Sequence, residues 1–196
     1  MTLPCLSFSE RLVRVNNLDA AGFAAWDFLP GMRFGGRAAW WREGAERELP
    51  HEGLDIGWFH TRDGRRLPLG VGARVPVIWQ GVVVAITPDF LGRSVFVAHD
   101  RLDAEGRRLH TVYGHIDPRP GLAPGDPLRE GSAIGVIADV SGRRTGVPSH
   151  LHVTIALIAR EGGPTRLDWN ALRDRSRVIL LDPEPILCCG HASGPR

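Results

Sequence analysis

A succession of short segments rich in β-branched residues, separated by glycine or proline, constrains the fold of this chain more than any other feature. Segments of this length and composition predict strands joined by tight turns, and the 24 glycines and 15 prolines supply the turn residues. We therefore expect an all-β fold with minor helices. The expected strands span residues 54–59, 75–86, 94–99, 109–115, 133–138, 151–158 and 178–181.

Helical signals are few. Asn17 is a candidate N-cap for a short helix over residues 18–28, and Asp168 is a candidate cap for a helix that begins at Trp169. The 196 residues suffice for about one domain with a sizeable core. We expect an N-terminal extension, partly helical, over residues 1–27, a main domain over residues 28–186 and a tail over residues 187–196.

The charge pattern excludes several classes of protein. All 24 basic residues are arginine, they are spread along the chain, and the net charge is only +2, so we expect no nucleic-acid partner. Without lysine, no Schiff-base or P-loop lysine is possible.

No apolar run reaches the roughly 20 residues of a membrane span, and the first 15 residues show no signal-peptide core. No sequence marker sets the oligomeric state, and we favour a monomer.

The three cysteines cannot form a disulfide scaffold. Two of them, Cys188 and Cys189, are adjacent, and with His191 they have the atoms for a metal site, but adjacent cysteines chelate one ion poorly. We expect incidental thiols near the termini.

Two motifs have the spacing of metal ligands. His51 and Asp55 occur in HEGLD, and His150 and His152 occur in SHLHV. Residues two or four apart on a strand point to one side, so each pair is expected to share a face. Two imidazoles and one carboxylate are a hydrolytic zinc set that leaves a fourth position for water, whose pKa zinc lowers from 15.7 to about 7. A third motif, TVYGH, places His115 at an expected strand end.

In order along the chain, HEGLD, VAHD, TVYGHI, the glycine-spaced residues 121–137, Thr145-Gly146 and HLH resemble the lysostaphin/LytM-type zinc metallopeptidases. The resemblance covers roughly residues 34–183. It implies a LytM-like metallopeptidase domain: a duplicated hybrid motif-like β-sandwich or barrel of antiparallel strands, with a groove over the zinc site. It also implies a zinc endopeptidase that hydrolyses peptide bonds of bacterial peptidoglycan, in stem-peptide crosslinks or in bridges. A periplasmic, envelope or secreted location follows from that substrate.

Carried over by motif, the resemblance assigns one Zn²⁺ to His51, Asp55 and His152. It makes His150 the general base, and we expect His115 to donate a hydrogen bond to the oxyanion. The chain departs from the family pattern at Val153-Thr154, where an aromatic residue and a glutamate are common. It also departs in the residues before His150, which are about two more than usual.

The remaining aromatic and histidine residues carry weaker expectations. Trp40 and Trp41 either wall a substrate groove or pack as surface aromatics on the strands. We expect a structural role in a turn for His99, and solvent exposure for His60, His110 and His191.

Two other functions remain open. One is a catalytically inactive LytM-like module that binds or regulates other wall hydrolases, which would hold no stoichiometric zinc. The other is a sugar phosphocarrier domain of a phosphotransferase system, in which two histidines relay a phosphoryl group. The HLH motif has no place in that relay.

Overall fold

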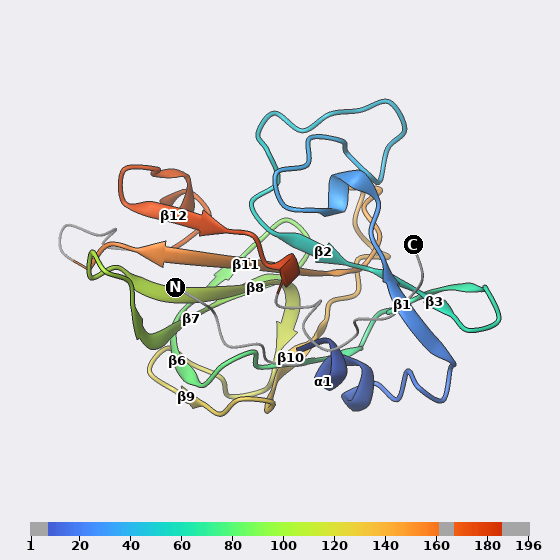
Figure 1. Ribbon diagram of the computed structural model, residues 1–196, viewed down its shortest axis with the longest axis horizontal. Coiled ribbons are helices and arrows are strands. Elements are labelled where there is room, and N and C mark those ends of the chain that lie inside the picture. Colours follow the sequence, from blue (N-terminus) through green and yellow to red (C-terminus); the bar gives the residue numbers. More distant parts are fainter. Residues whose placement is uncertain (1–7, 161–166, 186–196) are drawn as a thin grey trace.

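The computed structural model describes residues 8–160 and 167–185, and most of its regular structure is antiparallel strand (Figure 1). In chain order, the elements are α1 (Phe8–Val15), β1 (Phe23–Asp27), η1 (Pro30–Met32), β2 (Leu54–Ile56), β3 (Trp58–Thr61), β4 (Arg66–Pro68), β5 (Arg74–Pro76), β6 (Gly81–Pro88), β7 (Arg93–Leu102), β8 (Arg108–Pro118), β9 (Pro127–Leu128), β10 (Ala133–Ile137), β11 (Leu151–Ile158), η2 (Ala171–Arg173) and β12 (Val178–Leu181).

These strands form two sheets. The larger has the order β12-β11-β8-β7-β6-β9, with β2 paired to β11, and β10 paired to both β5 and β8. The smaller has the order β1-β3-β4. Neither sheet closes on itself, so the all-β prediction is confirmed while the barrel alternative is not.

The core explains why the strand prediction succeeded. Every residue of β11 is buried. Its edges pair with β8 on one side and with β2 and β12 on the other, and its two faces contribute to different apolar clusters, Val153 and Ile155 to one and Ala156 and Ile158 to the other. A strand covered on both faces has a nearly continuous apolar run, and this is what the sequence LHVTIALI shows, interrupted only by His152 and Thr154. The observed bounds of β11 and β12 equal the predicted ones.

Two predicted strands are divided. The run 54–59 breaks at Gly57 into β2 and β3, which belong to different sheets. The run 75–86 breaks between β5 and β6, where Ile78 and Trp79 are buried outside any strand. In each case the apolar pattern continues through a change of direction, so periodicity alone does not reveal the break.

The predicted helix over residues 18–28 is wrong. The helix lies earlier, as α1, and Asn17 follows its end with a φ of 53°. The Asn17 N–H donates to Arg14 O and the Leu18 N–H donates to Val13 O, as at a helix C-terminus closed by a left-handed residue. Asparagine serves at both ends of helices, and here it ends one.

The described part of the expected N-terminal extension is packed on the main core. Phe8, Leu12 and Phe23 are almost fully buried in the same apolar cluster as Ile56 and Ile155. A helical turn is found near the predicted place, but as the 3-10 helix η2, which begins at Ala171 rather than Trp169. Its N-cap is Asn170, while Asp168 accepts a hydrogen bond from the Ala171 N–H at 2.9 Å. The domain boundaries themselves stay predictions. Residues 8–160 and 167–185 contain no helix that could serve as a membrane span.

Candidate active site

Pairing between two strands brings the predicted metal ligands together. In the antiparallel register of β2 and β11, Asp55 lies directly opposite His152. His51 precedes β2 rather than lying within it, so the predicted strand face does not explain its position. Its backbone is held instead by hydrogen bonds with Gly35 and Gly36. The loop before β2 and the start of β11 thus meet, although they are about a hundred residues apart.

The three side chains converge closely. His51 Nε2 lies 3.1 Å from Asp55 Oδ1, His152 Nδ1 lies 2.8 Å from the same oxygen, and the two ring nitrogens are 3.1 Å apart. Among the described residues, these are the one group of three or more histidine, cysteine or acidic side chains whose ligand atoms all lie within 4.8 Å of one another. All three residues are buried.

The outer nitrogens fix how each imidazole faces this cluster. His51 Nδ1 lies 3.2 Å from the carbonyl oxygen of Arg33, which can only accept, so Nδ1 carries the proton and Nε2 presents a lone pair. His152 Nε2 lies 2.8 Å from Thr154 Oγ1, and we assign its proton to that bond, which leaves a lone pair on Nδ1. The hydroxyl of Thr154, one of the two residues at which the sequence departs from the expected pattern, thus holds the ring of His152.

Asp55 is held by the loop that precedes β2. Its Oδ2 accepts hydrogen bonds from Trp40 Nε1 at 2.7 Å and from the Arg47 guanidinium at 3.1 Å. Oδ1 is thereby left to the two histidines. Such partners set the orientation and charge of a metal ligand. Trp40 therefore supports a ligand from behind, and Arg47 in turn stacks on the ring of Trp41 at 4.7 Å.

Electrostatics favour the ligand forms of these groups. Burial alone would raise the pKa of Asp55, but its interactions with the imidazoles of His150, His51 and His152 outweigh this effect and hold the pKa well below its ordinary value. Burial lowers the pKa of His51, and Asp55 offsets this only in part. An ionised carboxylate and a neutral imidazole are the forms that bind metals.

Close packing at Gly53 fixes the distance between β2 and β11. A Cβ atom there would lie 2.3 Å from the carbonyl oxygen of Val153 and 2.6 Å from His152 Nε2. Real Cβ atoms do not approach so closely, so only glycine fits at this position of the HEGLD motif.

The donor set fits a divalent cation. His51 Nε2 and Asp55 Oδ1 are both acceptors, yet they face each other at 3.1 Å, and acceptors approach this closely when a cation lies between them. Two imidazole nitrogens and one carboxylate oxygen are ligands that zinc prefers, and three protein ligands are the number found at catalytic zinc sites. His51, Asp55 and His152 would hold the ion.

His150 lies beside this cluster. Its Nδ1 donates to the carbonyl oxygen of Pro148 at 2.8 Å, so its Nε2 is a proton acceptor, and that atom lies 3.4 Å from Asp55 Oδ1. The ring packs edge-on against Trp40, with the ring centres 5.0 Å apart. The extra residues before the HLH motif therefore do not displace this histidine from the cluster.

His115 lies on a bulge of β8. Ser94 of β7 faces two residues of β8, Gly114 and His115, and His115 has a φ of 62°, a conformation that few non-glycine residues adopt. Its ring centre lies 4.8 Å from that of His150. Burial lowers the pKa of His115 to about 4, although the hydrogen bond that its ring donates to Asp89 partly opposes this.

Asp89 holds His115 through both backbone and side chain. Asp89 Oδ1 accepts from His115 Nδ1 at 3.1 Å, and Oδ2 accepts from the His115 N–H at 3.0 Å. Nδ1 therefore carries the proton of the neutral ring, and Nε2 is an acceptor. The oxyanion-donor role expected for His115 thus requires the doubly protonated ring, a form that the Asp89 carboxylate stabilises.

Sequence reasoning missed Asp89 and Trp169. Asp89 also accepts from the Leu91 and Gly92 N–H groups, and its PDFLG context indicates only a turn. Trp169 Nε1 donates to Ser94 Oγ at 2.9 Å, and Ser94 donates to Asp89 at 2.6 Å. No local pattern in the sequence signals a chain of contacts that spans 80 residues.

A cavity of about 220 Å³, the central cavity, opens over the cluster. It is where a substrate could contact the candidate ligands and His115 and His150 together. The lining residues are Trp41, Arg47, Glu52, Asp55, Asp89, Phe90, His115, Val147, His150, His152, Trp169 and Arg173.

The other histidines lie elsewhere. His60 is exposed, as predicted, and pairs with Asp27 at 3.5 Å. The expectation that His110 is solvated is wrong, because it is buried on β8 and burial lowers its pKa to about 4. His99 is structural, but it lies in β7 rather than in a turn, bonded to Gln80 O and Thr111 Oγ1. Cys5, Cys188, Cys189 and His191 lie outside the described residues.

No family model matches the chain, and no curated protein matches it. Among solved structures, the putative glycyl-glycine endopeptidase LytM from Ruminococcus gnavus is 21% identical, with 71% of this chain and 46% of that chain covered and a TM-score of 0.42. A mutant catalytic domain of the prophage-encoded M23 protein EnpA from Enterococcus faecalis is 20% identical, with 73% and 90% covered and a TM-score of 0.40.

The structure of lysostaphin matches over 98% of this chain at 18% identity, with a TM-score of 0.53. The match covers 58% of lysostaphin, so the chain spans less than two thirds of that protein's length. Because the identity is below a quarter, the match establishes the architecture and leaves the chemistry to the residues. The chain has the fold of lysostaphin.

Proposed function

We propose that this chain is a zinc-dependent endopeptidase of the lysostaphin/LytM type that hydrolyses peptide bonds of bacterial peptidoglycan, and that it acts in the cell envelope or outside the cell. One observation carries the proposal: the ligand atoms of His51, Asp55 and His152 lie within 4.8 Å of one another beside a cavity that His115 and His150 also line. The ordered sequence motifs and the shared fold support the same reading.

Zinc bound by these residues would supply a Lewis acid that polarises the scissile carbonyl and acidifies the attacking water. The chain's own groups carry the remaining tasks. His150 Nε2, an acceptor because Nδ1 is bonded to Pro148, takes a proton from the attacking water. The bonds that Trp40 and Arg47 donate to Oδ2 hold Asp55 in place with its Oδ1 toward the two histidines.

His115 acts on the developing negative charge of the carbonyl oxygen. In its doubly protonated form the ring donates from Nε2 to that oxygen while Nδ1 remains bonded to Asp89. The proton that His150 Nε2 takes from the attacking water passes to the leaving amine, which must be protonated to depart. Burial lowers the pKa of His115 to about 4, and Asp89 opposes that effect in part by favouring the charged ring.

The test combines metal analysis with hydrolysis. Purified protein should contain about one equivalent of zinc, and chelation should remove the metal together with activity on cell-wall peptide. His152→Ala should lose both. If His152→Ala kept both metal and activity, the proposal would fail. A protein that binds no zinc would instead favour the inactive module, and phosphohistidine formed with a carrier protein would favour the phosphocarrier.

A further inference from the structure

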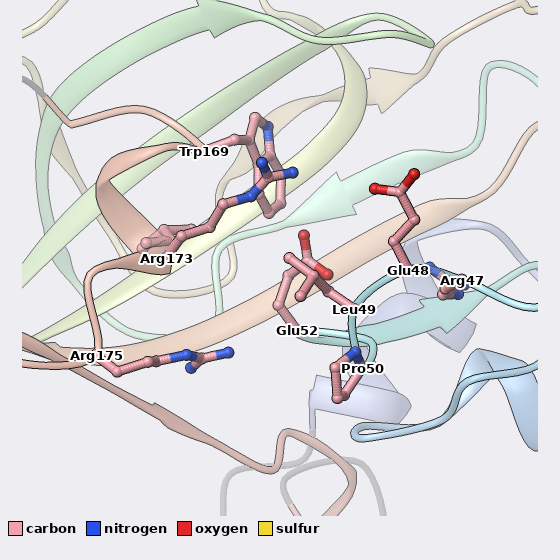
Figure 2. A pocket seen from close by; sticks show the side chains of 9 residues that line it. Arg47, Glu48, Leu49, Pro50, Glu52, Trp169, Arg173 and Arg175 are labelled. Atoms are coloured by element: carbon pink, nitrogen blue, oxygen red, sulfur yellow. The ribbon is translucent and has the colours of Figure 1, made fainter.

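A second pocket adjoins the central cavity. This side pocket has a volume of about 260 Å³, and Arg47, Glu52, Trp169 and Arg173 line both it and the central cavity (Figure 2). A peptide seated over the candidate ligands can therefore extend into the side pocket without leaving the protein surface. Leu49, which is 53% exposed, adds an apolar surface.

Five charged side chains line the side pocket, and four of them are sorted by sign. Figure 2 shows Arg173 and Arg175 on one side, from the segment around η2, and Glu48 and Glu52 on the other, from the loop before β2. Arg47, the fifth, lies beside Glu48 and is paired with Asp55 at 3.1 Å, so the unpaired charges form a cationic wall and an anionic wall. Trp169 and Leu49 provide apolar contact at the same pocket.

None of these four charged groups is paired within the described parts of the chain. No acidic oxygen of residues 8–160 or 167–185 lies within 4.0 Å of the Arg173 or Arg175 guanidinium in an ion pair, and Glu48 and Glu52 likewise have no basic partner there. By contrast, Arg177 of the same segment is paired with Asp174 at 3.6 Å. The opposite walls do not neutralise each other, so their charges are available to a ligand.

We infer that the side pocket is a substrate subsite for a zwitterionic part of the peptide, with a carboxylate at Arg173 and Arg175 and an ammonium group at Glu48 and Glu52. The inference rests on the proposed function, since it names which peptides that site prefers. It predicts charged stem peptides, rather than uncharged glycine bridges, as the substrate class. Guanidinium groups suit this task because they bind carboxylates in a planar, two-point geometry.

The size of the effect follows from exposure. Arg173 and Arg175 are exposed, and exposed ion pairs change an affinity by about two- to fivefold each. Two such pairs on the carboxylate should therefore change the preference for a charged peptide by about tenfold in total. Because salt screens exposed charges, the preference should shrink as ionic strength rises.

The test uses two synthetic peptides with the same scissile bond. One carries a residue with a free carboxylate and a free amine next to that bond, and in the other the carboxylate is amidated and the amine acetylated. We expect the protein to cleave the charged peptide with the higher kcat/KM, with the difference residing in KM. The double variant of Arg173→Gln and Arg175→Gln should lose about tenfold on the charged peptide and less than about twofold on the neutral one. The double variant of Glu48→Gln and Glu52→Gln should also lower the ratio of kcat/KM for the charged peptide to kcat/KM for the neutral one.

Arg177→Gln is the matched control, because it removes a neighbouring arginine that does not line the pocket. It should leave the ratio of the two kcat/KM values unchanged. If both peptides are cleaved equally, or if the double arginine variant keeps the wild-type ratio, the subsite is refuted while the proposed function stands. If neither peptide is cleaved and no zinc is bound, the proposed function fails and the subsite with it.

Discussion

Asp89→Asn tests how the candidate active site is held in place. Asp89 accepts five hydrogen bonds, from the Leu91, Gly92 and His115 N–H groups, the Ser94 hydroxyl and the His115 ring. Asparagine has nearly the same shape but keeps only one accepting oxygen. With that oxygen in the place of Oδ1, an NH₂ group faces the His115 N–H, and two donors then oppose each other.

The expected loss can be worked from these contacts. A buried N–H left without an acceptor costs about 1–3 kcal/mol, and the remaining bonds lose the strengthening that a charged acceptor gives. The backbone of His115, at a φ of 62°, also loses a bond that holds it. We therefore expect Asp89→Asn to lower the free energy of unfolding by about 2–4 kcal/mol at neutral pH.

The charge of Asp89 sets the sign of the pH dependence. Burial opposes its ionisation, but hydrogen bonds from His115 and Ser94 outweigh this and depress its pKa in the folded protein. The stabilisation is therefore complete above the ordinary pKa of 3.8 and is lost as the pH falls below it, toward the folded value. Asp89→Asn should remove this part of the acid dependence.

Equilibrium unfolding in urea measures the first effect, as a lower midpoint with an unchanged slope. The same measurement repeated between neutral and acid pH tests the lost acid dependence. Nitrogen NMR tests the hydrogen bond to the ring, because loss of the carboxylate should shift the His115 proton from Nδ1 toward Nε2. Asp103→Asn is the control: Asp103 accepts two backbone N–H groups and the Arg107 guanidinium in an exposed turn, and its loss should cost less than about 1 kcal/mol. A change below about 0.5 kcal/mol in Asp89→Asn, with the His115 tautomer intact, would refute the reasoning.

Three further outcomes are expected. Gly53→Ala should reduce zinc affinity by at least tenfold, because its Cβ would displace β11 at His152. Competition with a chelating dye measures this affinity, and an unchanged value would contradict the packing argument. Chelation should lower the unfolding temperature of the wild type but leave that of His152→Ala unmoved, and an equal response of the two would contradict the ligand assignment. His110 has a folded pKa of about 4 against an ordinary 6.5, so the free energy of unfolding should fall as the pH drops from 6.5 toward 4. His110→Gln should remove this fall, which is on the order of 3 kcal/mol, as measured by urea denaturation at several pH values across that window.

Local pattern was enough to predict much of the fold. Strands such as β11 and β12 were predicted with their bounds because β-branched runs bounded by turn residues have few alternatives. The helix around Asn17 was misplaced because one residue can either begin or end a helix, and the choice depends on what the flanking turns pack against. Phe8 and Leu12 decide it here, by burying α1 in the core.

The candidate ligands were predictable for a different reason. His150 and His152 flank the start of a single strand, and His51 and Asp55 belong to one short motif, so each pair is local in sequence. Only the prediction that the two pairs lie together in space depended on the fold. The resemblance in the order of the motifs already implied that they do. The register of β2 against β11 then fixes the meeting, because it places Asp55 opposite His152.

The groups that orient those ligands were not predictable in this way. Trp40 and Arg47 come from the loop before β2, and their sequence is equally compatible with a groove wall or a solvated surface. Their partner is one oxygen of a buried carboxylate, and nothing about their spacing identifies it. A ligand must match the chemistry of its metal, so its residue type and spacing are constrained. A residue that supports a ligand needs only to reach it with a donor, and many side chains can do this from many places in the chain. The supporting groups of this site therefore depend on tertiary structure to a degree that the ligands themselves do not.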